Sequence, residues 1–325
     1  MKIAVADNTG KKFIQDLLDH WVKMGHEVKY ERGASEYLAQ WADVYYVEWI
    51  DGNLDYLYKL YNDPDCENRT KDWDNNKKPK IICRMIDWDI WCDYISTKNR
   101  KYIDFCDHIV SIVPHMKRKL MDNGVPEGKI TLIRPGVNLD KFPLKKASWN
   151  GHVHGTDGFQ LGMVLGDMWW PKNHMGGLDI FTQLYRRNDK WRLHIRGQHE
   201  GGEYWPVMYD HYLESRGIKD AVTLYQPQDD MNEWYEKIDI LLHPGMKETF
   251  SYATAEAMSK GIPAIVNEFY GSRDIWPGNM LYQTHSEAIK MIESVHKMKV
   301  NKELRAWIEN NYPQQKMNSE FDKLL

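Results

Sequence analysis

Short apolar runs alternate with amphipathic stretches along most of the chain. Residues 2–7 (KIAVAD) have the composition of a buried strand, residues 13–25 repeat apolar positions at helical spacing and end in glycine, and residues 26–32 again favour a strand. This pattern predicts a helix that connects two parallel strands. A chain in which strands and helices alternate in this way typically folds as a parallel sheet with helices on its faces.

A polar segment interrupts this alternation once. Residues 145–158 (KKASWNGHVHGTDG) are rich in glycine and show no periodicity, and a new series of apolar runs starts at residue 159. We therefore expect two Rossmann-like, doubly wound parallel-sheet domains of the α/β class, at residues 1–148 and 149–311, with a C-terminal helix over 312–325 that packs back on the first. Because ligands bind beyond the carboxyl ends of parallel strands, we expect the two domains to face each other across a cleft.

The composition narrows the range of partners. A net charge of -4 over 325 residues provides no overall attraction for nucleic acid or anionic lipid. No stretch reaches the roughly 18 apolar residues of a membrane span, and the N-terminal segment turns polar too soon for a signal peptide, so we expect a cytoplasmic protein without a transmembrane segment. The cysteines form no CxxC pair, which favours free thiols over a disulfide set or a zinc site.

Two glutamates flank a run of small side chains in residues 247–266 (KETFSYATAEAMSKGIPAIV). The apolar run before this segment predicts a strand, and the run after Glu248 predicts a helix that ends at Gly261. The first turn of such a helix has free N–H groups and the positive end of the helix dipole, where phosphate binds. Glu256 is able to accept two hydroxyl hydrogen bonds, as a ribose-binding acid does. An equally simple interpretation makes Glu248 a partner of the helix dipole and Glu256 part of a solvated face.

The same stretch resembles the signature of the GT4-type retaining glycosyltransferases of the GT-B fold, in which two glutamates contact the sugar nucleotide. Residues 108–142 resemble the end of that family's N-terminal domain, residues 161–181 its donor-binding loop, and residues 222–250 the approach to the glutamates. The resemblance implies transfer of a sugar from a nucleoside diphosphate sugar, a UDP- or GDP-sugar, to a hydroxyl acceptor with retention of anomeric configuration. It implies an acceptor-side N-terminal domain, a C-terminal domain that binds the nucleotide sugar, and neither a cofactor nor a catalytic metal.

The resemblance also implies roles for single residues. Glu256 corresponds to the ribose ligand, and Glu248 corresponds to a catalytic residue that contacts the hydroxyls of the donor sugar. Lys172 corresponds to the lysine that neutralises the donor diphosphate, a role that suits its compact ammonium group. The backbone amides that meet phosphate or sugar correspond to those of Thr249, Phe250, Ser251 and Tyr252.

Other positions depart from the family pattern or match it weakly. Asp167 stands where the family usually has an arginine, which makes Arg196, at the end of WRLHIRG, a candidate replacement cation. After the fourth strand many relatives have a histidine, whereas this chain has Arg84 and Asp87; we take Asp87 as a candidate catalytic residue because strand ends lie at the expected site. Gly10, after the first strand, stands where family members place a glycine-containing loop near the donor phosphates.

The sequence leaves the acceptor and the catalytic status open. A carbohydrate, a lipid-linked acceptor or, as for phage-type enzymes, a modified nucleobase in DNA would each provide a hydroxyl. The many Trp and Tyr residues would suit stacking on a nucleobase, whereas the acidic net charge does not favour binding to DNA. Residues 116–121 (MKRKLM) would suit a weak contact with a membrane surface. Asp167 and the missing histidine are equally compatible with a non-catalytic protein that binds a sugar nucleotide.

Overall fold

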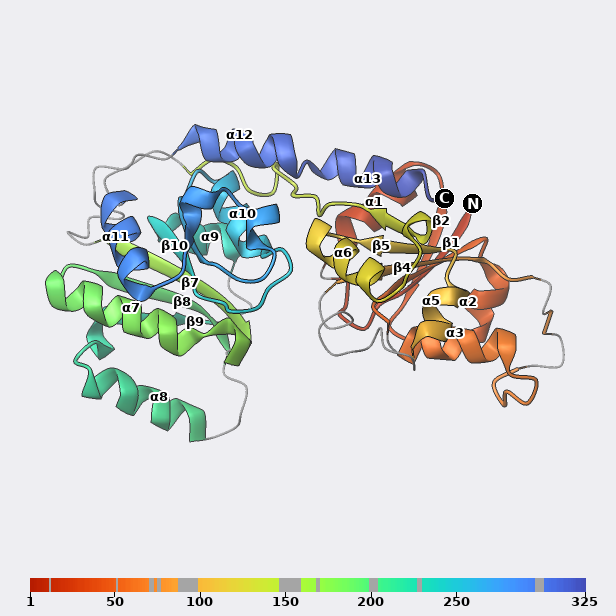
Figure 1. The fold of residues 1–325 in the computed structure, drawn as a ribbon, viewed down its shortest axis with the longest axis horizontal. Coiled ribbons are helices and arrows are strands. Elements are labelled where there is room, and N and C mark those ends of the chain that lie inside the picture. The colour runs from red at the N-terminus through yellow and green to blue at the C-terminus, as the bar shows by residue number, and fades with distance from the viewer. Residues whose placement is uncertain are drawn as a thin grey trace. The chain divides into compact units, whose positions relative to one another are not determined.

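The computed structural model describes residues 1–11, 13–50, 52–69, 73–74, 77–86, 99–145, 159–167, 170–198, 204–226, 230–295 and 301–325. The chain folds into two compact units, one of residues 1–136 with 314–325 and the other of residues 137–313. The expected boundary between residues 148 and 149 lies outside the described residues. Among the described residues each unit has a six-stranded parallel sheet flanked by helices, which confirms the predicted α/β class (Figure 1).

The N-terminal unit has the strand order β2-β1-β3-β4-β5-β6. Its strands are β1 (Lys2–Ala6), β2 (Glu27–Glu31), β3 (Val44–Glu48), β4 (Lys80–Met85), β5 (His108–Ser111) and β6 (Ile130–Leu132). Its helices in the described residues are α1 (Gln15–Lys23), α2 (Glu36–Trp41), α3 (Gly52–Asn62), α5 (Arg100–Phe105), α6 (Pro114–Asp122) and α13 (Gln314–Asp322). Because β2 and β3 lie on opposite sides of β1, the strand order reverses between β1 and β3.

The C-terminal helix α13 belongs to the N-terminal unit. Phe321 packs edge-on against the rings of Trp21 and Tyr46, with centroid distances of 6.3 and 5.7 Å. The Nε2 atom of His20 lies 2.8 Å from a carboxylate oxygen of Asp322. Burial of these aromatic rings provides the apolar contact that holds the last helix on this unit.

The C-terminal unit has the strand order β12-β11-β10-β7-β8-β9. Its strands are β7 (Gln160–Asp167), β8 (Arg192–Gln198), β9 (Val222–Tyr225), β10 (Ile240–His243), β11 (Ala264–Asn267) and β12 (Leu281–Tyr282). Its α-helices in the described residues are α7 (His174–Arg187), α8 (Tyr204–Ser215), α9 (Met231–Glu236), α10 (Tyr252–Ser259), α11 (His285–Val295) and α12 (Lys302–Asn311).

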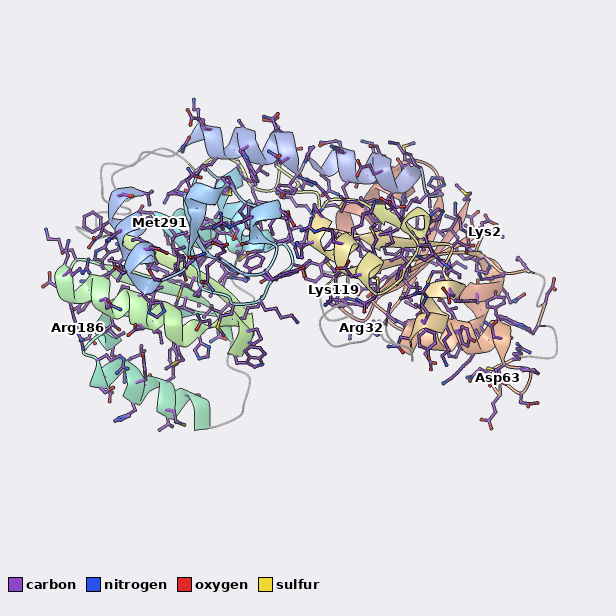
Figure 2. The ribbon with its side chains drawn as sticks, viewed as in Figure 1. Lys2, Arg32, Asp63, Lys119, Arg186 and Met291 are labelled. Atoms are coloured by element: carbon purple, nitrogen blue, oxygen red, sulfur yellow. The ribbon has the colours of Figure 1, made fainter. Side chains whose placement is uncertain are left out.

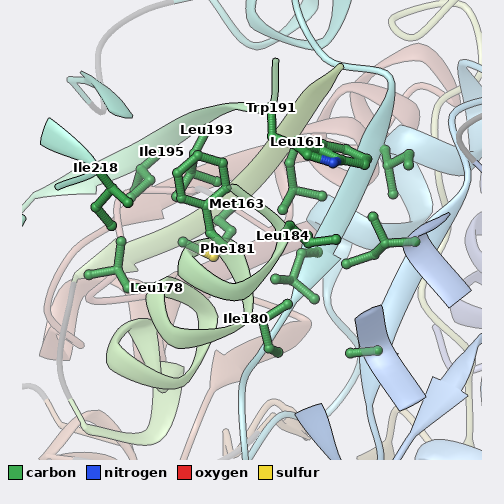
Figure 3. Close-up of a cluster of buried hydrophobic side chains, with 14 of the residues drawn as sticks. Leu161, Met163, Leu178, Ile180, Phe181, Leu184, Trp191, Leu193, Ile195 and Ile218 are labelled. Atoms are coloured by element: carbon green, nitrogen blue, oxygen red, sulfur yellow. The ribbon is translucent and has the colours of Figure 1, made fainter. Parts of the chain in front are cut away.

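The core of the C-terminal unit forms where α7 covers the sheet (Figure 3). Leu178, Phe181 and Leu184 of α7 are fully buried together with the inward-facing side chains of β7 and β8. Gly177 allows this close approach, because a Cβ atom at that position would lie 2.4 Å from the sulfur of Met163. The polar face of the helix remains outside, and charged side chains such as Arg186 are exposed (Figure 2).

The strand order determines where this sheet can bind a ligand. The chain proceeds from β7 towards β8 and β9 on one side, and from β10 towards β11 and β12 on the other. In open α/β sheets ligands bind beyond the carboxyl ends of the strands at the point where the order reverses. In the C-terminal unit this point lies between β7 and β10, so the loops that follow these two strands carry the candidate site.

Candidate functional site

Backbone and side-chain hydrogen bonds join the loops after β7 and β10. The first loop includes the 3₁₀ turn Trp170–Lys172 and ends at Asn173, whose side chain caps α7 and also donates to the carbonyl of Pro244 at 3.1 Å. The backbone N–H of Met246 donates to the carbonyl of Pro171 at 2.9 Å. These bonds hold the end of one loop against the start of the other.

Lys172 and Glu248 meet at this junction. The Nζ atom of Lys172 lies 2.6 Å from Oε2 of Glu248, and the side chains are 27% and 18% exposed, so both remain accessible to a ligand. Burial by itself raises the pKa of Glu248, but the charge of Lys172, the nearby His243 and hydrogen bonds from Lys172 and Thr249 outweigh it, and the net pKa is lowered. Glu248 is therefore ionised at neutral pH.

His243 lies beneath this pair, although sequence reasoning did not select it. It is the last residue of β10, it is 4% exposed, and its Nε2 atom lies 4.0 Å from Oε2 of Glu248. Among the described residues this Nε2 atom has no hydrogen-bond partner. Burial lowers the pKa of His243 to about 4, so the imidazole is neutral at neutral pH. The available signal was a histidine that ends a buried strand immediately before Pro244.

The start of α10 is fixed in an unusual backbone conformation. Ser251 precedes the helix with a φ of +60°, and its side chain accepts a hydrogen bond from the backbone N–H of Thr254. Phe250 is 2% exposed and stacks on Trp276 at a centroid distance of 5.3 Å. The side chain of Phe250 therefore anchors the turn in the core, which leaves only its backbone for the predicted contact with a ligand.

Glu256 is held by a second residue that sequence reasoning missed, Tyr235. The hydroxyl of Tyr235 lies 2.9 Å from Oε2 of Glu256 and 3.0 Å from the carbonyl of Ala253. Burial raises the pKa of Tyr235 well above its usual value and Glu256 raises it further, so the hydroxyl stays protonated and donates. The positive charge of Arg196 opposes this rise in the pKa of Tyr235.

Arg196 lies on β8 beside the strand that ends at Asp167. The backbone register pairs Arg196 with Val164, and Asp167 with Gln198, across an irregularity at Val164 to Gly166. The side chain of Asp167 lies outside the described residues, so a replacement of the missing arginine by Arg196 stays a prediction.

The remaining predicted residues belong to the N-terminal part of the chain. Gly10 lies in the N-terminal unit with a φ of +77°, in a loop where the buried carboxylate of Asp7 accepts hydrogen bonds from the backbone N–H groups of Thr9 and Lys11. Asp87 lies outside the described residues. The described part of the chain contains no group of three His, Cys, Asp or Glu side chains arranged to hold a metal ion.

Comparisons of the sequence with known proteins match about half of the chain or less. Residues 160–297 match the model of the family described as Glycosyl transferases group 1. D-inositol 3-phosphate glycosyltransferase 2 of Catenulispora acidiphila is 23% identical over 172 residues, which are 50% of this chain and 40% of that protein. D-inositol 3-phosphate glycosyltransferase of Streptosporangium roseum is 23% identical over 53% of this chain and 41% of that protein. The matches thus span well under half of these relatives.

Structural comparisons extend over the whole chain. The structure of Anabaena Alr3699/HepE in complex with UDP has a TM-score of 0.74 at 13% identity and covers 99% of both chains. The lipopolysaccharide outer core galactosyltransferase WaaB in its apo form has a TM-score of 0.68 at 19% identity, covering 100% of this chain and 99% of that one. At these identities the likeness concerns the fold, which is that of the GT-B glycosyltransferases. No helix in the described ranges is long and apolar enough to cross a lipid bilayer.

Proposed function

Because residues 160–297 match the model of the family described as Glycosyl transferases group 1, we propose that the protein transfers a sugar from a nucleoside diphosphate sugar to a hydroxyl acceptor with retention of anomeric configuration. The observation that carries this proposal is the pair of Lys172 and Glu248 at the point where the strand order reverses. A cation and a carboxylate that are both partly exposed at such a point can bind a diphosphate and sugar hydroxyls side by side.

Each proposed role follows from the chemistry of the side chain. Lys172 neutralises the diphosphate of the donor, and backbone N–H groups at the start of α10 bind its oxygens. Glu248 accepts hydrogen bonds from hydroxyls of the donor sugar. Tyr235 orients Glu256, whose carboxylate accepts hydrogen bonds from the two hydroxyl groups of the ribose. Gly10 and Asp87 of the N-terminal unit keep their proposed roles near the donor phosphates and the reaction centre.

The proposed chemistry requires no enzymic nucleophile. The charge that develops on the leaving diphosphate is stabilised by Lys172 and by the helix start, and the diphosphate takes the proton from the incoming hydroxyl on the same face of the sugar. This front-face route forms the new glycosidic bond on the side from which the old one breaks, so the configuration is retained.

UDP is the first nucleotide to test. Structures with this fold were obtained with UDP and with UDP-glucose bound to Anabaena Alr3699/HepE. We propose a UDP-sugar as donor, and GDP and ADP are the comparison ligands in a thermal-shift screen, since a ligand that binds the folded protein raises its melting temperature.

The activity test combines turnover with matched variants. We expect slow release of UDP from UDP-glucose by the wild-type protein, and at least a tenfold lower rate in Glu256→Ala. Glu309→Ala, which alters an exposed glutamate of α12, is the control and should behave as wild type. Once an acceptor is identified, NMR of the product tests retention. Binding without any turnover would favour the alternative of a non-catalytic sugar-nucleotide-binding protein.

A further inference from the structure

Two side-chain nitrogen atoms lie near one oxygen of Glu248. Nζ of Lys172 lies 2.6 Å from Oε2, and Nε2 of His243 lies 4.0 Å from the same atom. The distance to Lys172 is that of a charge-assisted hydrogen bond, whereas the distance to His243 exceeds a hydrogen bond by roughly 1 Å. His243 is thus a near neighbour of this carboxylate without being its present partner.

The imidazole is held in place by its surroundings. Its ring lies edge-on to Phe269 at a centroid distance of 6.2 Å. Gly245 leaves space for the ring, because a Cβ atom there would lie 3.1 Å from Nε2 of His243. The charged groups that act on the ring are Glu248 and Lys172, and burial keeps it neutral. A neutral imidazole with its proton on Nε2 is a hydrogen-bond donor towards Glu248.

In the proposed function Lys172 has to bind the donor diphosphate, although in the present structure it is paired with Glu248. The ammonium group that now pairs with Glu248 has to neutralise a diphosphate when the donor binds. Glu248, whose side chain is 18% exposed, then loses a charge-assisted hydrogen bond. The backbone N–H of Thr249 and the sugar hydroxyls remain as its donors, and a further donor in place of Lys172 would strengthen binding of the diphosphate.

We propose that His243 is a positioning residue, which donates a hydrogen bond to Glu248 when Lys172 leaves Glu248 and binds the diphosphate. This inference rests on the proposed function and deepens it. The exchange breaks the hydrogen bond from Lys172 to Oε2 and forms one from Nε2–H of His243, and no covalent bond or proton transfer is involved. It requires a shift of about 1 Å, which a change of side-chain rotamer at Glu248 provides.

Two substitutions of His243 distinguish the effect of losing its hydrogen-bond donor from the effect of losing the imidazole ring. His243→Gln keeps an N–H donor at similar reach, whereas His243→Leu removes it. With UDP as the probe in calorimetry, we expect His243→Leu to weaken binding about tenfold to a hundredfold, and His243→Gln to remain within about threefold of wild type. If His243→Leu does not fold, as judged by circular dichroism, His243→Met serves as the donor-free variant.

The same His243 substitution in a Glu248→Gln protein distinguishes this positioning role from a general effect of His243 on the structure. In Glu248→Gln no carboxylate needs a new partner, so adding His243→Leu should change the affinity for UDP less than about twofold. An equal loss in both backgrounds, an unchanged affinity of His243→Leu, or a loss in His243→Gln as large as in His243→Leu would each overturn the inference alone. A wild-type protein that binds neither UDP nor UDP-glucose would overturn the proposed function together with it.

Discussion

Both sheets carry a glutamate paired with a cation at the carboxyl ends of central strands, and the two pairs differ in their surroundings. In the N-terminal unit, Glu48 at the end of β3 pairs with Arg84 of β4 at 2.9 Å, with side chains that are 1% and 3% exposed. Glu48 also accepts a hydrogen bond from the hydroxyl of Tyr46 at 2.6 Å. In the C-terminal unit, Lys172 and Glu248 are several times more exposed, and the neighbouring Nε2 atom of His243 has no hydrogen-bond partner among the described residues.

This difference is the basis for proposing that the pair in the C-terminal unit, rather than the pair in the N-terminal unit, binds a ligand. Burial raises the pKa of Glu48 in spite of the opposing charge of Arg84, whereas the partners of Glu248 lower its pKa in spite of burial. The pair in the N-terminal unit is sealed by its own hydrogen bonds and supports the architecture. The pair in the C-terminal unit is partly exposed and has His243 nearby, and the proposed exchange of partners rests on this arrangement.

The largest expected effect is a loss of protein stability when the buried pair of Glu48 and Arg84 is broken. Arg84→Met leaves the carboxylate of Glu48 buried without its cation, which should lower the free energy of unfolding of the N-terminal unit by about 3–5 kcal/mol. Denaturant titration followed by circular dichroism measures this change. The comparison would fail if Arg84→Met were as stable as the wild type, because the pair would then contribute nothing to the architecture.

Substitution in the partly exposed pair of Lys172 and Glu248 should lower activity rather than stability. Lys172→Met is expected to lower kcat/KM for UDP-glucose about a hundredfold to a thousandfold, since the developing charge on the diphosphate loses its cation. Its melting temperature should stay close to that of the wild type, because the side chain is partly solvated. Lys190→Met, at an exposed lysine, is the matched control. Full activity of Lys172→Met would remove the site assignment.

The pH dependence of stability tests the buried imidazole. Between pH 6.5 and about 4 the unfolded chain protonates His243 while the folded protein keeps it neutral. Stability therefore falls as the pH decreases through this window, by up to about 1.4 kcal/mol per pH unit for one such group. His243→Gln should show a shallower slope in denaturant titrations at several pH values. His194, whose pKa burial also lowers to about 4, accounts for part of the slope that remains in this variant.

The smallest expected effect concerns the start of α10. Ser251→Ala loses the side-chain cap and keeps a residue with a Cβ at a φ of +60°, which should cost about 1 kcal/mol. Ser251→Gly loses the same cap but adopts this conformation freely, so its cost should be below about 0.5 kcal/mol. Thermal unfolding of both variants decides this order, and a glycine variant less stable than the alanine variant would contradict it.

The fold was predictable from the sequence because it follows from local patterns. Apolar runs that alternate with helical periodicity predict parallel sheets, and the run ILLH at residues 240–243 is such a strand. The order of the strands was not predictable, because it depends on pairing between segments far apart in the chain, such as β7 with β10. That order determines which loops meet and therefore where the site lies.

The candidate site was predictable only in part. Glu248, Glu256 and Lys172 stand in motifs whose spacing can be read directly, although their functional roles stay proposals. His243 and Tyr235 lie in a strand and a helix where their side chains resemble core residues, and only the fold brings them to the glutamates. Pattern analysis of one sequence detects a ligand-facing residue more readily than the residue that orients it.

The central claim is that the junction of Lys172 and Glu248 binds the diphosphate of the donor. A crystal structure of the protein in complex with UDP tests it most directly. We expect the diphosphate at the start of α10 with Nζ of Lys172 within hydrogen-bond distance of a phosphate oxygen, the ribose on Glu256, and Oε2 of Glu248 closer to Nε2 of His243 than the present 4.0 Å. A diphosphate bound elsewhere, with Lys172 still paired to Glu248, would contradict the account.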